Sequence, residues 1–193
     1  MADIDPVQPS DSELLELSKA GDSMAFRHLV DRFHGQLLAT ATGMLGPGTE
    51  AEEVVQETLI RFHRALQRFE GRSSLATYLT RITMNEALKV INRRNRWLSR
   101  FLSRDDPDRL MVDPVEELGM CSMEQAERID SIREAVQALK PEFRSVVVLR
   151  FLNEYSTEEC ANILGIPSGT VMSRLSRALD KLGPALKGLN QNG

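Results

Sequence analysis

The chain has 193 residues, of which 41% are hydrophobic and 27% are charged, a composition typical of a globular protein with one or two small domains. Aromatic residues make up only 5%, and the formal net charge at pH 7 is −4. The two cysteines lack CxxC spacing and the three histidines are scattered, so we expect no metal and no cofactor. Because no apolar run is long enough to span a bilayer and the acidic start is unlike a signal peptide, we expect a cytoplasmic protein without direct membrane insertion.

The charge changes sign along the chain. Residues 1–60 hold 3 basic and 11 acidic residues, whereas residues 61–104 hold 11 basic and 2 acidic residues. Residues 105–142 are acidic again, with 4 basic and 11 acidic residues, and residues 143–193 hold 6 and 4. A basic block between two acidic blocks indicates that different segments meet different partners.

Hydrophobic spacing in the first half of the chain predicts helices only. Gly46-Pro47-Gly48 breaks the pattern, with Thr49 as the expected cap of the helix that follows. A loop over residues 70–74 precedes the last helix of this half, with Ser73 or Ser74 as its cap. The predicted helices cover residues 11–20 (capped by Asp11 and Ser12), 23–44 (after Gly21-Asp22), 49–66 and 75–98.

The second half begins with a change of composition. Residues 99–124 contain prolines and many acids and predict an acidic, flexible linker. The acids named for the linker are Asp105, Asp106, Asp108, Asp113, Glu116 and Glu117. Helical spacing then resumes with Ile129, and Pro141 starts a helix that continues to Leu152. The expected fold is therefore all-α: two small helical domains, residues 11–98 and 125–187, joined by the linker.

Residues 157–176 predict a helix-turn-helix, the motif that places its second helix in the major groove of DNA. Ala161 is small where the helices approach each other, Gly165 supplies the turn, and Val171 faces inward. An ordinary helical hairpin explains these three residues but leaves an outward face of small polar and basic side chains unexplained. That face consists of Ser168, Thr170, Ser173, Arg174 and Arg177.

Two further helix faces are strongly charged. The helix over residues 75–98 mixes cations and amides, which suit phosphates and base edges, although a simply solvated face is the alternative. Tyr78 on this helix could stack on an unpaired base or pack in the core. The helix over residues 49–66 instead shows an acidic side with Glu52, Glu53, Gln56 and Glu57, which DNA would repel.

Together these segments resemble a bacterial RNA polymerase sigma factor of the extracytoplasmic-function (ECF) group. Residues 52–58 (EEVVQET) resemble the segment that docks on the β′ clamp helices of the polymerase. Residues 69–85 (FEGRSSLATYLTRITMN) resemble the stretch that melts and reads the minus-ten element, and residues 163–175 (ILGIPSGTVMSRL) resemble the reader of the minus-thirty-five element. The resemblance covers residues 11–98 and 125–187.

The resemblance implies the residues of three binding sites. The implied polymerase-binding residues are Glu52, Glu53, Val55, Gln56, Glu57 and Leu59. The implied minus-ten residues are Arg72, Ser73, Ser74, Tyr78, Arg81, Asn85, Lys89, Arg93 and Arg96. The implied minus-thirty-five residues are Ser168, Thr170, Ser173, Arg174, Arg177 and Lys181. It also implies core polymerase (β′ clamp helices and β flap), promoter DNA and an anti-sigma factor as partners.

The sequence departs from the family pattern at three places. Tyr78 stands where tryptophan is usual, Lys89-Val90 where an aspartate is common, and Met172 where the recognition helix often has lysine. The alternative function is a stand-alone helix-turn-helix regulator, but no heptad run or spare hydrophobic helix supplies a dimer interface. A nucleic-acid enzyme is not expected, because the basic strip holds only Glu70 and Glu86 and no nucleophile constellation.

Overall fold

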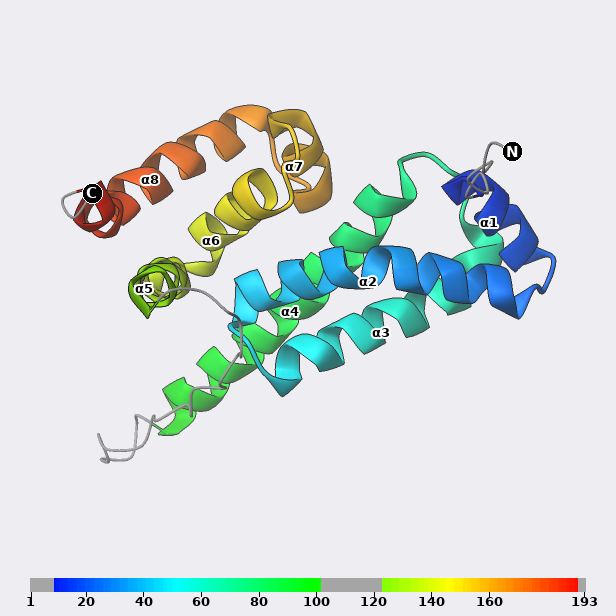
Figure 1. The fold of residues 1–193 in the computed structure, drawn as a ribbon, viewed down its shortest axis with the longest axis horizontal. Helices are drawn as coiled ribbons and strands as arrows, with labels where there is room; N and C mark the ends of the chain where they lie inside the picture. Colours follow the sequence, from blue (N-terminus) through cyan, green and yellow to red (C-terminus); the bar gives the residue numbers. More distant parts are fainter. Residues whose placement is uncertain (1–8, 102–122, 191–193) are drawn as a thin grey trace, which may run out of the picture.

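The computed structural model describes residues 9–101 and 123–190, of which 100, 101, 123–128 and 185–190 are described by their backbone alone. Within these ranges the chain is helical and has no strand, which confirms the predicted all-α fold (Figure 1). The helices are α1 (Asp11–Lys19), α2 (Ser23–Leu45), α3 (Thr49–Ala65), the 3-10 turn η1 (Leu66–Arg68), α4 (Leu75–Phe101), α5 (Met123–Ala138), α6 (Pro141–Val147), the π-helical η2 (Val148–Leu152), α7 (Thr157–Leu164) and α8 (Ser168–Asn190). The six acids named for the linker, and Cys121, lie outside the described residues.

The N-terminal domain is built from α1 to α4. Helices α2, α3 and α4 pack against one another, and α1 covers one end of α2 (Figure 1). Each helix buries apolar residues that recur every three or four positions, so that one stripe faces the common core. The buried residues of this core include Leu29, Phe33, Leu37, Met44, Val54, Phe62, Leu79 and Met84.

The helix starts differ in detail from the predicted caps. Ser10, not Asp11 or Ser12, caps α1, because its side chain forms a capping box with Glu13. Thr49 does not cap α3. The N-cap is Gly48, which has no side chain to bond the amides of the first turn and whose φ is 129°. For α4 the expectation is confirmed, since the Ser74 hydroxyl accepts a hydrogen bond from the Thr77 amide at 3.1 Å.

The C-terminal domain contains the predicted helix-turn-helix. The first helix, α7, begins with a capping box in which Ser156 pairs with Glu159. Gly165 follows α7 in the left-handed conformation (φ 66°, ψ 35°), where a glycine carries no Cβ penalty. The second helix, α8, begins at Ser168 and packs on both α6 and α7. The run Val146–Val148 lies in α6 and η2, so its helical assignment is confirmed.

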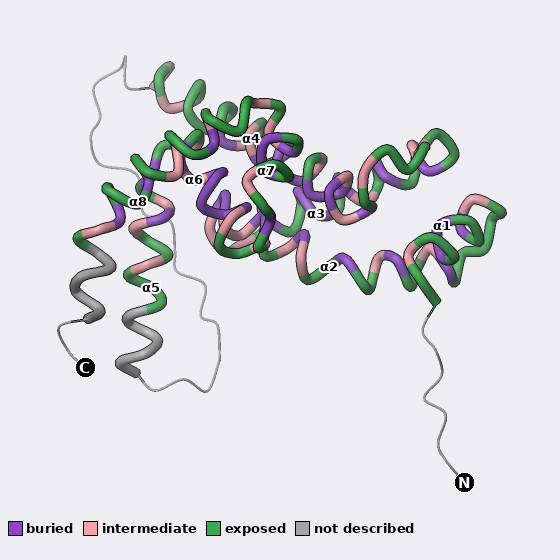
Figure 2. The backbone as a smooth tube through the Cα atoms, turned by 90° about the horizontal axis from the view of Figure 1, so that it is seen from above, coloured by how far each residue is buried: buried purple, intermediate pink, exposed green. Residues whose placement is uncertain are grey.

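The two domains are packed on each other in this structure. One continuous core includes Leu37 of α2, Leu79 of α4 and Val146 of α6, and also Cys160 of α7. A second, smaller cluster joins α5, α6 and α8, and α5 and α8 lie side by side (Figure 2). The predicted two-domain organisation therefore appears as two helical units with a shared buried seam.

Candidate nucleic-acid interface

The outer face of α3 is acidic and accessible. Glu52, Glu53 and Gln56 are exposed on successive turns, and Glu57 is partly exposed. Val55, however, is only 2% exposed and belongs to the core, so its implied role as a surface contact is wrong for this structure. Leu59 is partly buried against the same core.

The cations implied for the minus-ten site lie on α4 and the loop before it, and their side chains make contacts within the chain. Arg72 pairs with Glu70 at 2.7 Å, and Arg93 lies 3.6 Å from Glu50. Arg81 donates from Nη2 to the Asn162 carbonyl of α7 at 2.7 Å. The other implied residues of this site are accessible to different degrees: Ser74, Asn85, Lys89 and Arg96 are exposed, and Ser73 and Tyr78 are partly exposed.

Tyr78 packs against the core, which is one of the two alternatives that the sequence left open; stacking on an unpaired base stays a prediction. Its ring packs against Phe69, with 4.8 Å between ring centroids, and meets Phe62 edge-on at 6.3 Å. The residue is only partly buried, and its side chain lines a groove between α3 and α4. One face of Tyr78 therefore stabilises the N-terminal core while the residue remains accessible at the surface.

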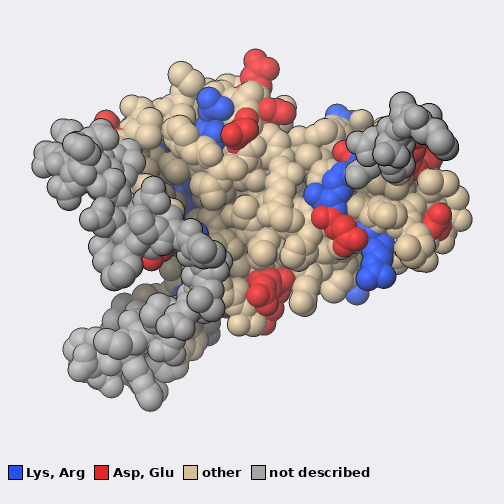
Figure 3. Space-filling model, viewed as in Figure 1, with Lys and Arg blue, Asp and Glu red and all other residues tan. Residues whose placement is uncertain are grey.

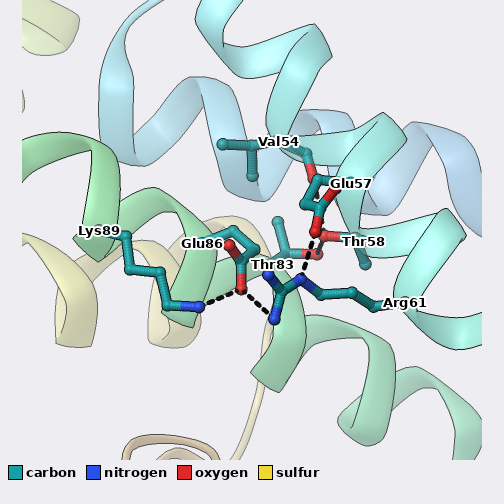
Figure 4. A network of polar contacts seen from close by, with 7 residues as sticks. All are labelled: Val54, Glu57, Thr58, Arg61, Thr83, Glu86 and Lys89. Atoms are coloured by element: carbon teal, nitrogen blue, oxygen red, sulfur yellow. Dashed lines mark hydrogen bonds and ion pairs between the residues drawn. The ribbon is translucent and has the colours of Figure 1, made fainter. Parts of the chain in front are cut away.

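A polar network joins α3 to α4 beside this groove (Figure 4). Glu86 is nearly buried and accepts contacts from Lys89 Nζ at 2.8 Å and Arg61 Nη1 at 3.3 Å. Arg61 is also held by Glu57, with 2.6 Å between Nε and the carboxylate. Spacings of three and four residues could have revealed the pairs within each helix, whereas the crossing pair of Arg61 and Glu86 depends on the packing of α3 against α4.

The outward face of α8 carries the residues implied for the minus-thirty-five element. Ser168, Ser173, Arg177 and Lys181 are exposed, and Thr170 and Arg174 are partly exposed. Val171 is fully buried and fixes the opposite side of the helix, as predicted. Met172 is 60% exposed and lies within this polar face. The helix therefore presents a continuous accessible surface of hydroxyls, cations and one thioether.

Burial perturbs three ionisable groups near the domain seam. Desolvation raises the pKa of the Cys160 thiol to about 11, although nearby Arg150 lowers it. Burial also raises the pKa of Tyr155, against hydrogen bonds from Thr80 and Gln36. The pKa of Arg144 is lowered by burial and by the charge of Arg94. Cys160 and Tyr155 are buried and Arg144 is partly buried, so none of the three belongs to an exposed face.

Within the described ranges of the chain there is neither a cluster of metal ligands nor a membrane-spanning helix. On the face shown in Figure 3, a few acidic and basic side chains lie among uncharged residues in the described part of the surface. Among the described residues, no three or more His, Cys, Asp or Glu side chains cluster as a metal would require. No described helix combines the length and the apolar character needed to cross a membrane.

Fold and surface thus define a two-domain helical protein with an exposed acidic face on α3 and exposed faces that carry cations on α4 and α8. Comparison with known families agrees with this class. The family model Sigma-70 region 2 matches residues 29–97, and the model Sigma-70, region 4 matches residues 129–182. The first match spans α2 to α4, and the second spans the helix-turn-helix and the helices before it.

Two individual relatives indicate the group of sigma factors to which the chain is similar. The ECF RNA polymerase sigma-E factor of Escherichia coli (strain K12) is 31% identical over 183 residues, which cover 91% of this chain and 93% of that protein. The RNA polymerase sigma-H factor of Pseudomonas aeruginosa is 29% identical over 192 residues, covering 94% and 96%. The chain belongs to the ECF group of RNA polymerase sigma factors, which direct promoter-specific initiation of transcription.

Solved structures share the fold. The sigma factor RpoE of Bartonella quintana, solved in complex with the anti-sigma factor NepR, has a TM-score of 0.65 and 25% identity, covering 84% of this chain and 96% of that chain. CnrH in complex with the cytosolic domain of CnrY has a TM-score of 0.64 and 24% identity, covering 91% and 96%.

Proposed function

We propose that the three exposed faces divide the work of promoter recognition among them. The acidic face of α3 (Glu52, Glu53, Gln56 and Glu57) docks on the β′ clamp helices of core polymerase. The exposed face of α4 and its preceding loop reads and opens the minus-ten element, and α8 reads the minus-thirty-five element in the major groove. The observation that carries this division is the accessibility of Glu52, Glu53 and Gln56 on a helix whose other side is core.

The same proposal assigns no chemical step to the protein. Hydrogen bonds and charge contacts position the DNA, and an unpaired base must be bound to offset a few kcal/mol of lost stacking. The polymerase supplies the catalysis of RNA synthesis, so the chain acts as a binding factor rather than an enzyme. We further propose a cytoplasmic location, where the bacterial polymerase and promoter DNA are found, and contact of the C-terminal domain with the β flap.

An anti-sigma factor is the remaining proposed partner. Its support is the relative RpoE of Bartonella quintana, which was solved with the anti-sigma factor NepR. Such a partner would compete with core polymerase for the sigma factor. Addition of the correct anti-sigma factor is therefore expected to abolish transcription and to be overcome by excess core polymerase.

The test of the proposed function is run-off transcription with bacterial core polymerase on a library of random-sequence templates. We expect discrete starts that require the protein, and we expect them to vanish when Glu53 and Gln56 are both replaced by alanine. Asp31→Ala is the matched control, because it removes an exposed carboxylate from α2 instead of α3. Site-specific DNA binding without polymerase-dependent starts would contradict the proposal and indicate a stand-alone regulator.

A further inference from the structure

The end of helix α2 is capped by two side chains of the other domain. The last four carbonyls of an α-helix have no partner within the helix. Gln137 of α5 donates from Nε2 to the carbonyls of Thr42 at 3.3 Å and Gly43 at 2.9 Å. Arg144 of α6 donates from Nη1 to the Met44 carbonyl at 2.5 Å. We call Gln137 and Arg144 the latch, because both belong to the C-terminal domain and both bond to carbonyls of the N-terminal domain.

Contacts within the C-terminal domain fix the latch in position. Arg144 donates from Nη1 to Gln137 Oε1 at 2.8 Å and from Nη2 to the Leu139 carbonyl at 3.0 Å. A cation beside the C-terminal end of a helix is also favoured by the helix dipole. The latch therefore combines directed hydrogen bonds with a favourable charge at the end of α2.

Close packing on either side of the latch completes a closed form of the chain. Gly43 has no side chain, and a Cβ added there would lie 3.0 and 3.1 Å from the two γ-methyls of Val148. Helix α7 packs on α4, and Arg81 of α4 donates to the Asn162 carbonyl of α7 at 2.7 Å. The helix proposed to read the minus-ten element is thus in contact with the first helix of the helix-turn-helix.

The closed form is too short to span a promoter. Ser168, which begins α8, follows Asn162 by six residues and lies within about 20 Å of it even if the chain between them is extended. The middle of the proposed minus-thirty-five face, near Arg174, is about 10 Å further along α8. By their names the two elements are centred about 25 base pairs apart, which is about 85 Å along B-DNA. Because a duplex of this length is stiff, a chain in which Arg81 stays bonded to Asn162 cannot place α4 and α8 on both elements at once.

We propose that the seam between the domains is an autoinhibitory contact: the latch holds the free chain in a closed form that cannot span a promoter, and binding to core polymerase opens it. This role rests on the proposed reading of the two elements by α4 and α8. It adds a control over when they act, because only the opened chain presents its two reading helices at the spacing of a promoter.

The first test locks the seam with a disulfide in the double variant Gly43→Cys, Val148→Cys. The contacts of the added Cβ bring these two positions within the short range that a disulfide spans, and Val148→Cys removes a γ-methyl that would crowd the new side chain. Oxidised glutathione closes the bond and dithiothreitol reopens it. We expect the oxidised double variant to lose run-off transcription with core polymerase and to regain it on reduction. Each single variant should transcribe in both states, which also controls for the native cysteines.

Three outcomes of this test would overturn the proposal. Equal transcription by the oxidised and the reduced double variant would show that the closed form can span a promoter. Failure of the free chain to form the disulfide would show that the seam is not closed in solution. Core polymerase should slow the formation of the disulfide, followed by non-reducing electrophoresis, and equal rates with and without polymerase would show that its binding does not open the seam.

The second test asks whether the latch holds the closed form. Gln137→Ala in the double-cysteine background removes both amide bonds to α2, so we expect the free chain to form the disulfide several-fold more slowly. Glu134→Ala is the control, because Glu134 is exposed on α5 one helical turn earlier and has a side chain of nearly the same size. An unchanged rate in Gln137→Ala, or the same slowing in both variants, would refute the role of the latch.

The proposed function fails on a different result, the absence of any transcript from the wild-type holoenzyme. The disulfide in the free chain and its dependence on Gln137 need no transcript. These two measurements therefore still decide whether the latch holds a closed form.

Discussion

At the scale of single residues, the burial of Cys160 makes the stability of the fold depend on pH. Its thiol is fully buried, and its pKa is raised from 9.0 to about 11, mainly by desolvation, with a smaller raising effect from Glu159. Between these two values the folded protein keeps a proton that the unfolded chain has lost. The contribution to stability is therefore fully present below pH 9 and is lost as the pH rises through about 11.

The free energy of unfolding should fall by up to about 1 kcal/mol per pH unit above pH 9 on account of Cys160. Urea unfolding of the wild type and of Cys160→Ala, at pH values below and above 9, measures this share. The variant is expected to lose less stability on going to high pH, although Tyr155, with its own raised pKa, keeps part of the dependence. The same pH dependence in both proteins would contradict the prediction.

The exposed position of Met172 leads to a second prediction for a single residue. It is 60% exposed on α8, next in sequence to Ser173, one of the residues proposed to meet duplex DNA. Met172→Lys adds a phosphate partner there, so we expect tighter promoter binding and a salt slope steeper by about 0.9. Ile129→Lys adds the same charge to an exposed apolar position on α5 and should not change the slope. Fluorescence anisotropy over a salt series measures both.

At the scale of the element, α7 depends on its first turn. The Ser156 hydroxyl accepts a hydrogen bond from the Glu159 amide at 3.2 Å, and the Glu159 carboxylate accepts one from the Ser156 amide at 2.8 Å. Ser156→Ala should lower the free energy of unfolding by about 1 kcal/mol, since the Glu159 amide in the first turn of this eight-residue helix loses its partner. Ser176→Ala, at an exposed position within α8, should be neutral or slightly stabilising in the same urea titration.

The existence and order of the helices follow from local sequence, because the apolar spacing repeats wherever a helix packs on the core. Their ends were predicted less well for a physical reason. Ser10 and Asp11 are both good caps, and only the position of Glu13 three residues after Ser10 selects the true one. The π-helical η2 has no local signal of this kind, and it arises where Val148 and Leu152 pack against Gly43 of α2.

The residues of the proposed binding faces could also be predicted only in part. Spacing along one helix placed Glu52, Glu53 and Gln56 on an exposed side, but it also assigned Val55, which the packing of the N-terminal domain buries. Contacts between helices were beyond reach from sequence. The bond from Arg81 to the Asn162 carbonyl joins residues 81 positions apart, and no local pattern predicts it.

At the scale of the whole molecule, the seam between the domains is held by polar contacts. The Tyr155 hydroxyl lies 3.0 Å from Gln36 Nε2 and 2.9 Å from Thr80 Oγ1, so it bridges α2 and α4. Asn153 donates to Thr40 at 2.8 Å, yet its Oδ1 is buried without a partner in the described part of the chain. The unpaired oxygen makes this part of the seam less favourable, whereas the hydrogen bonds and the shared apolar core of Leu37, Leu79 and Val146 hold the domains together.

Gly43 is the position where this seam can be forced apart. A Cβ added there would lie 3.0 and 3.1 Å from the γ-methyls of Val148 and 3.5 Å from Leu152, all on the other domain. Gly35, two turns earlier in α2, has no atom within 4 Å of its added Cβ. Gly43→Leu and Gly35→Leu therefore give the same gain in helix propensity, and only the first places a side chain in the seam.

We expect Gly43→Leu to increase the radius of gyration in small-angle X-ray scattering, and Gly35→Leu to leave it unchanged. Opening would also free Arg81 from Asn162, so the free Gly43→Leu chain should bind a single-stranded oligonucleotide more tightly than the wild type does. The radius of gyration and the affinity for the oligonucleotide must change together, because both changes follow from the separation of α7 from α4. A larger radius without tighter binding would show that Arg81 is not a nucleic-acid contact, and an unchanged radius would show that the seam accommodates the leucine by repacking.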